Sequence, residues 1–189
     1  MIFNSLHFLI FLPVVIFLYY ALPYKWRWLM LLFASYYFYM CWKAEYAFLI
    51  VFSTTVDYYT ANKMSRMSDR KGRLPYLMIS LISNLGLLFS FKYFNFFNDS
   101  ARAVFEQFDI FYNVPEFNLF LPVGISFYTF QALSYSIDVY RGDFKAEKNF
   151  GYFALFISYW PQLVAGPIER PGDLQPQLKQ NFDFDYDRV

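Results

Sequence analysis

The sequence is short of the residues from which disulfides and transition-metal sites are built. It has one cysteine, Cys41, and one histidine, His7, among 189 residues. A lone cysteine has no partner for an intramolecular disulfide, and zinc sites draw on several cysteines and histidines. We therefore expect neither a disulfide within the chain nor a metal site.

Charged residues are also scarce, which argues against an ordinary soluble protein. They make up 16% of the chain, against about 25% in soluble domains. The net charge is +1, and the basic residues do not gather on one amphipathic face, so we expect no nucleic-acid partner. Hydrophobic residues reach 58% and aromatic residues 25%, a composition typical of a protein embedded in a lipid bilayer.

The N-terminus lacks the features of a cleaved signal peptide, because its apolar run has no basic segment before it and no small-residue cleavage site after it. The first apolar run is therefore predicted to remain as a membrane helix. Internal repeats and low-complexity linkers are absent as well. Residues 1–189 are accordingly predicted to form a single membrane domain.

The apolar runs predict an all-α bundle of several transmembrane helices. At 1.5 Å per residue, about 20 apolar residues cross a hydrocarbon core of about 30 Å. Residues 99–112 separate apolar from polar side chains and are predicted to form an amphipathic helix in the membrane interface. The five predicted spans are residues 6–22, 28–42, 46–61, 74–91 and 117–137.

The fifth predicted span carries a polar stripe. Gly124, Tyr128, Gln131, Tyr135 and Asp138 recur at steps of four, three, four and three residues, which places them on one helix face. Lipid tails cannot satisfy these groups, so this face must contact protein or water. Tyr128, Gln131 and Tyr135 are therefore candidates for lining a substrate passage. The alternative is that they only hydrogen-bond one helix to another.

A later apolar segment runs into residues that disfavour helix. Pro161, Gly166, Pro167 and Pro171 fall within eleven residues, so residues 161–171 are predicted to leave helical geometry as a broken or re-entrant sixth element. Irregular backbone at membrane depth is tolerated only against protein or a wet cavity. Pro161, Gln162, Gly166 and Pro167 are therefore candidates for lining a pocket or passage.

Other charged residues are interpreted as structural. Asp57, inside the third span, is expected either to reach the wet interface or to be paired inside the bundle. Asp138 lies three residues before Arg141 and is interpreted as an interface carboxylate rather than a catalytic acid. Glu169 and Arg170 are interpreted as an outlying ion pair.

The distribution of positive charge predicts an orientation. If the connectors after spans one, three and five share a side, that side collects ten lysines and arginines and the other side three. The positive-inside rule then places the N-terminus outside the cytoplasm and residues 62–73 within it. The ten are Lys25, Arg27, Lys63, Arg66, Arg70, Lys71, Arg73, Arg141, Lys145 and Lys148.

Several blocks resemble a known family when taken in order. The blocks LPVGISFYTFQALSYSIDVYRG and PQLVAGPIERP resemble membrane-bound O-acyltransferases, specifically their bacterial alginate O-acetyltransferase branch. The blocks MIFNSLHFLIFLPVVIFLYYALP, LLFASYYFYMCW and NLGLLFSFKYFNFF resemble the same branch, so the similarity covers nearly the whole chain. Each block alone is only apolar and aromatic, but the ordered combination is specific.

The resemblance implies a bacterial inner-membrane enzyme that moves an acyl group, most simply acetyl, to a hydroxyl of an extracytoplasmic polysaccharide such as alginate. It implies an acyl donor such as acetyl-CoA or a relayed acyl carrier, and periplasmic acetyltransferase partners. It also implies a catalytic histidine that takes the hydroxyl proton. That histidine belongs to a downstream block, and His7 matches no such motif and is interpreted as an interface histidine.

No catalytic residue is therefore assigned in this chain, which is expected to be the N-terminal part of a longer enzyme whose C-terminal half is missing here. Two alternatives stay open at the level of sequence. A transporter or channel subunit would explain the polar stripe and the broken element without chemistry. An inactive fragment that serves only in assembly would explain the absence of the histidine.

Overall fold

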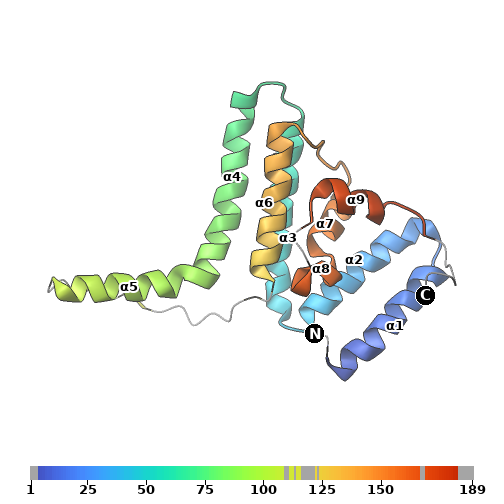
Figure 1. The fold of residues 1–189 in the computed structure, drawn as a ribbon, viewed down its shortest axis with the longest axis horizontal. Helices are drawn as coiled ribbons and strands as arrows, with labels where there is room; N and C mark the ends of the chain where they lie inside the picture. The colour runs from blue at the N-terminus through green and yellow to red at the C-terminus, as the bar shows by residue number, and fades with distance from the viewer. Residues whose placement is uncertain are drawn as a thin grey trace.

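The computed structural model describes residues 4–108, 111–112, 114–115, 122, 124–166 and 169–182. Within these ranges every regular element is helical (Figure 1), so the all-α prediction is confirmed. The helices are α1 Leu6–Ala21, α2 Tyr24–Met40, α3 Ala47–Ser65, α4 Arg70–Leu88, α5 Phe94–Gln107, α6 Ile125–Arg141, α7 Phe150–Ser158, α8 Trp160–Ala165 and α9 Pro171–Leu178. A 3-10 turn, η1 Ala44–Tyr46, precedes α3, and a π-helical turn, η2 Phe89–Tyr93, joins α4 to α5.

Local sequence signals set the ends of several helices. The Asp69 side chain accepts a hydrogen bond from the backbone N–H of Lys71 at the start of α4. Asn149 does the same for Gly151 at the start of α7. Polar side chains at such positions satisfy N–H groups that have no partner within the helix. Gly142 ends α6 with a left-handed backbone (φ +87°), a conformation that glycine adopts without steric cost.

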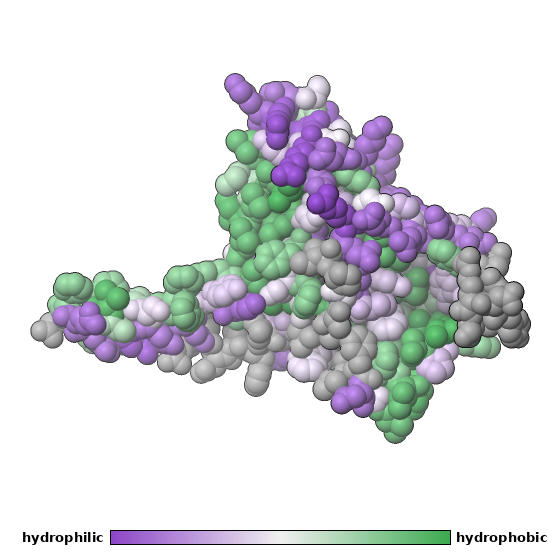
Figure 2. All heavy atoms as spheres, viewed as in Figure 1, coloured by the Kyte–Doolittle hydropathy of each residue, from purple (hydrophilic) through white to green (hydrophobic). Residues whose placement is uncertain are grey.

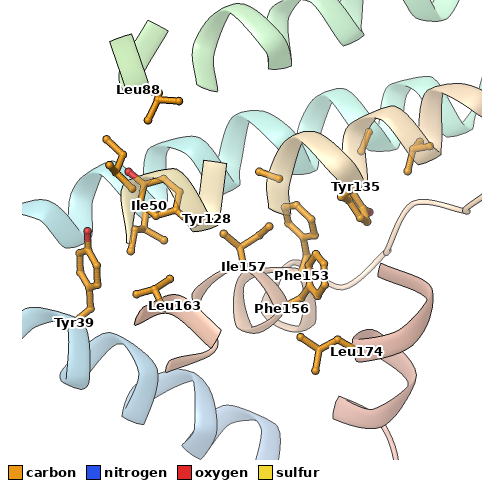
Figure 3. Packing of buried hydrophobic residues seen from close by; sticks show 14 of the residues in the cluster. Tyr39, Ile50, Leu88, Tyr128, Tyr135, Phe153, Phe156, Ile157, Leu163 and Leu174 are labelled. Carbon is orange, nitrogen blue, oxygen red and sulfur yellow. The ribbon is translucent and has the colours of Figure 1, made fainter. Parts of the chain in front are cut away.

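The core lies where α3, α4 and α6 pack together and where α7 closes over them (Figure 1). Figure 3 shows buried side chains from several helices meeting there, among them the tilted rings of Tyr135 on α6 and of Phe153 and Phe156 on α7. Tyr135 and Phe153 have ring centroids 4.6 Å apart. A second, smaller cluster joins α1 and α2 to Trp160 of α8. The chain therefore builds one continuous helical body from helices distant in sequence.

A buried hydrogen-bond network ties α3, α4 and α6 together around Asp57, which is fully buried. The Asn84 amide donates to both carboxyl oxygens of Asp57, at 2.8 and 2.9 Å, and Ser80 donates to one of them. Ser80 also lies 2.9 Å from the hydroxyl of Ser136 on α6. Ser53 completes the network by donating to Asn84 at 2.7 Å. Of the two outcomes expected for Asp57, the structure shows the paired one.

The outer surface is apolar along its flanks and polar at one end. Figure 2 shows hydrophilic side chains over the connector between α3 and α4 and the apolar flank of α4 beside them. That flank exposes Ile79, Ile82 and Leu85. By length and composition, one helix in the described part can cross a membrane, the continuous stretch Arg70–Gln107, and α1 is a shorter apolar helix. The count of five spans stays a prediction.

The predicted amphipathic helix differs from the observed one in its bounds. Residues 99–112 were expected to form it, but α5 begins at Phe94 as a continuation of η2 and ends at Gln107. Figure 1 shows α5 pointing away from the bundle, across the direction of α4. The helix starts earlier than predicted, because Ser100 lies inside it, with its hydroxyl donating to the carbonyl of Phe96 at 2.8 Å. Residues 109–110 and 113 lie outside the described ranges.

The end of α3 and the start of α4 are hydrogen-bonded to α6 and to the connector that follows it, at one end of the molecule. Asn62 at the end of α3 donates to the carbonyl of Glu147 at 3.1 Å, and Arg73 donates to the carbonyl of Tyr140 at 3.2 Å. Tyr24 at the start of α2 donates to the carbonyl of Lys179. We refer to this end of the molecule as the basic end.

Candidate functional site

Two predicted site residues, Gln131 and Gln162, lie against each other. The Gln131 amide nitrogen donates to the side-chain oxygen of Gln162 at 3.3 Å and to the backbone carbonyl of Phe156 at 2.8 Å. Both glutamines are buried. Because the Gln162 oxygen faces Gln131, its amide nitrogen points away from the pair, and this nitrogen is buried without a hydrogen-bond partner in the described part of the chain. The pair thus presents one unused donor.

A groove runs beside this pair. It has a volume of about 710 Å³ and lies between α1 on one side and α8 and α9 on the other. We call it the α1 groove. The α1 side of the groove is apolar and includes Leu12, Val15 and Ile16. The opposite side includes Pro161, Gln162 and Gly166. Three residues of the predicted broken segment therefore border a groove, and their role in a passage stays a prediction.

The helix break falls at a different residue from the one predicted. Pro161 was expected to begin the non-helical segment, but it sits in the first turn of α8, where a missing backbone N–H leaves no hydrogen bond unmade. The helix is interrupted instead at Tyr159 (φ −55°, ψ 110°). Pro171, the expected end of the break, occupies the first turn of α9 in the same way. Both corrections have one physical reason: proline disfavours helix interiors but suits helix starts.

The start of α6 is packed tightly against α8. Gly124 precedes the helix with a left-handed backbone (φ +77°). A Cβ atom at this position would lie 2.4 Å from the carbonyl oxygen of Leu163. Only glycine meets both conditions. Gly124 therefore sets how closely α6, which carries Gln131, approaches α8, which carries Gln162.

The two tyrosines of the predicted stripe have different surroundings. Tyr128 and Tyr135 are both fully buried, so their face is sheltered by protein as expected. The Tyr135 hydroxyl accepts a hydrogen bond from the backbone N–H of Glu147 at 2.8 Å, which makes it a link between α6 and the following connector. The hydroxyl of Tyr128 has no hydrogen-bond partner in the described ranges, and neither does that of Tyr39 on α2. Tyr39 and Tyr128 belong to the same buried cluster (Figure 3).

Comparison with known proteins identifies relatives of the chain. It is 39% identical over 180 residues to the probable alginate O-acetylase AlgI of Azotobacter vinelandii, and 39% identical over 180 residues to that of Pseudomonas aeruginosa. These alignments cover 94% of this chain and 36% and 34% of the two relatives. Over nearly its whole length, the chain is thus similar to proteins named alginate O-acetylase. It spans about a third of the length of these curated relatives.

A more distant relative carries another name. The peptidoglycan O-acetyltransferase of Helicobacter pylori is 30% identical over 176 residues, which cover 80% of this chain and 32% of that protein. Neither a family model nor a solved structure matches the chain.

The single histidine and the outlying charged residues lie away from the glutamine pair or take other positions than expected. His7 lies in the first turn of α1, with its Nε2 atom 3.1 Å from the hydroxyl of Tyr37, well away from the glutamine pair in sequence and on a different helix. Glu169 and Arg170, expected to pair, form no ion pair within the described ranges. Glu169 instead lines the α1 groove, as does Tyr159.

Pro167 and Tyr39 differ in what the sequence predicted for them, and a metal site was not expected. Pro167, predicted to line the pocket, lies outside the described residues. Tyr39 was not predicted from the sequence, because it lies in a continuous aromatic run and no periodic signal distinguishes it there. The groups of three or more histidine, cysteine and acidic side chains that hold metal ions do not occur in the described part of the chain.

Proposed function

We propose that this chain forms part of an integral-membrane O-acetyltransferase that acts on a polysaccharide outside the cytoplasm. The observation that carries the proposal is the 39% identity over 94% of the chain to proteins named alginate O-acetylase. Alginate is the first candidate acceptor. Peptidoglycan is the second, because a relative at 30% identity is named for it.

Within that activity, we assign the glutamine pair and the α1 groove to the passage of a reactant. A fixed amide donor beside an apolar groove suits an acyl group, whose carbonyl oxygen accepts a hydrogen bond while its carbon chain stays out of water. Gln162 lines the groove, and its unused amide nitrogen, which is buried, would supply that donor once the side chain turns toward the groove. Acetyl-CoA or a relayed acyl carrier is the corresponding source of the acyl group.

The deprotonation of the acceptor hydroxyl is assigned to residues outside this chain. Taking that proton needs a base within hydrogen-bond reach, and the one histidine here, His7, is bonded to Tyr37 at the start of α1. The chain spans about a third of the relatives' length. The remaining two thirds of such a protein is therefore the proposed partner that supplies the base, together with periplasmic acetyltransferase partners.

The proposed setting is a bacterial cytoplasmic membrane crossed by α1, α2, α3, α4 and α6, with α7 and α8 as a broken, re-entrant pair. The apolar outer flanks and the polar end shown in Figure 2 support this arrangement. The exposed phenylalanines Phe96 and Phe97 of α5, and Phe108 directly after it, suit a helix lying in the membrane interface. The N-terminus is proposed to lie outside the cytoplasm, opposite the basic end.

A chimera tests the proposal. Residues 1–189 would replace the matching third of the Pseudomonas aeruginosa alginate O-acetylase, and the acetyl ester content of secreted alginate would be measured. We expect acetylated polymer. A parallel chimera carrying the matching third from Azotobacter vinelandii shows whether the exchange itself is tolerated. If only that control acetylates, while both chimeras reach the membrane in equal amounts, acetyl transfer to alginate is the wrong assignment.

A further inference from the structure

A second hollow lies at the basic end, away from the α1 groove. It has a volume of about 740 Å³ and lies between the end of α3 and the connector from α6 to α7. Two hydrogen bonds fix these walls to each other: Tyr58 donates to the carbonyl of Lys148, and Asn62 donates to that of Glu147 at 3.1 Å. We call this hollow the basic pocket. Its polar lining includes Tyr58, Tyr59, Asn62, Lys63, Arg66 and Lys148.

The basic pocket carries uncompensated positive charge. Lys63, Arg66 and Lys148 line it, and no acidic side chain does. Within the described ranges none of the three forms an ion pair, and Glu147, the neighbour of Lys148, pairs with Lys179 instead. Three cations around one hollow attract an anion, and the attraction is strongest where no protein carboxylate competes.

The outer face of α3 shows which kind of anion fits. Phe48 and Phe52 are exposed along this face, and Tyr59 is exposed two turns further on. Lys63 follows one turn after Tyr59, with its amine 5.5 Å from the centre of the Tyr59 ring, and Arg66 lies on the same face. The order apolar, then tyrosine, then basic is that of side chains crossing from hydrocarbon to lipid headgroups.

We propose that the basic pocket binds the phosphate-bearing headgroup of an anionic phospholipid, with the lipid's acyl chains lying along the Phe48 and Phe52 side of α3. The phosphate would accept hydrogen bonds from Arg66, Lys63 and Lys148, as basic pockets at membrane interfaces do for anionic headgroups. Tyr59 marks the level at which the headgroup meets the chains. The site does not depend on acetyl transfer.

Native mass spectrometry of the full chain in a neutral detergent tests this site. Phosphatidylglycerol and phosphatidylethanolamine would be titrated in parallel, and we expect the anionic lipid to be retained preferentially. The double variant Arg66→Gln with Lys148→Gln should weaken phosphatidylglycerol binding about tenfold, because each basic residue adds to headgroup attraction. The matched control is Lys25→Gln with Lys71→Gln, which removes the same charge from exposed positions outside the pocket and should change binding less than about twofold.

Three results would overturn the proposal. Equal weakening by both double variants would mean that the lipid responds only to net charge. Equal retention of the two lipids would mean that the headgroup charge is not recognised. Displacement of the lipid by inorganic pyrophosphate, with pyrophosphate binding lost in the pocket variant, would assign the pocket to a soluble phosphate compound. If the double variant does not fold, Arg66→Gln alone gives the same comparison.

Discussion

The side-chain amide of Gln131 is bonded at once to Gln162, at 3.3 Å, and to the carbonyl oxygen of Phe156, at 2.8 Å. Phe156 belongs to the last turn of α7, where carbonyl groups lose their partners within the helix. The Gln131 amide thereby satisfies a carbonyl at the end of α7 and orients Gln162 of α8. The two glutamines are chemically alike, but their removal has different consequences for stability.

Gln131→Leu and Gln162→Leu are expected to separate stability from activity. Gln131→Leu leaves the buried Phe156 carbonyl without its donor and should lower the free energy of unfolding by about 1–3 kcal/mol. Gln162→Leu removes a nitrogen that is already unpaired, together with an oxygen that accepts only the longer 3.3 Å hydrogen bond from Gln131, so its cost should be smaller than that of Gln131→Leu. In the chimeric acetylase, Gln162→Leu should nevertheless reduce polymer acetylation about tenfold, which corresponds to about 1.4 kcal/mol in the barrier. Normal acetylation by this variant would remove Gln162 from the site.

Gly124→Ala should be strongly destabilising, and Gly86→Ala is its control. Alanine at position 124 would combine a left-handed backbone with a Cβ atom 2.4 Å from the carbonyl oxygen of Leu163, and a cost of at least about 2 kcal/mol follows. At Gly86, inside α4, an added Cβ meets no atom within 4 Å, so alanine should gain about 0.5–1 kcal/mol from helix propensity. Thermal unfolding in detergent measures both. Similar midpoints for the two variants would contradict the close approach of α6 and α8.

The inward face of α6 could be predicted from the sequence because it depends only on helix periodicity. On any α-helix, residues spaced by three and four positions lie on one face. This holds for Tyr128, Gln131 and Tyr135, and all three are buried. Which groups they meet could not be predicted, since their partners come from other helices. The partner of Gln131 on α7, Phe156, offers a backbone carbonyl that no side-chain pattern reveals.

The network around Asp57 had a sequence signal that spacing alone could have revealed. Ser53 and Asp57 are four residues apart on α3, and Ser80 and Asn84 are four apart on α4, so each helix carries a polar pair on one face. Two such pairs in neighbouring spans favour contact in a lipid environment. The position of the helix break, in contrast, depends on Tyr159, whose identity carries no such signal.

Ser80→Ala should destabilise the protein, whereas Ser83→Ala should not. The Ser80 hydroxyl donates to Asp57 and contacts Ser136, so its loss leaves a buried carboxyl oxygen with fewer donors and should lower the free energy of unfolding by about 1–3 kcal/mol. The Ser83 hydroxyl is buried without a partner in the described ranges. Alanine there removes an unsatisfied group from a helix and should be neutral or slightly stabilising. Urea or thermal unfolding compares the two, and an equal effect would contradict the network.

The membrane orientation can be tested through the connector between α3 and α4. Ser68 is exposed at the basic end, and Glu45 is exposed beyond α2 at the opposite end of the molecule. On a Cys41→Ser background, Ser68→Cys should resist a membrane-impermeant thiol reagent added to intact cells, because the basic connectors are retained in the cytoplasm. Glu45→Cys should react under the same conditions. After the cells are permeabilised, both should be labelled, which controls for accessibility. Labelling of Ser68→Cys in intact cells, with protection of Glu45→Cys, would reverse the proposed orientation and would put the basic pocket on the outer leaflet, where its anionic lipid would have to be sought instead.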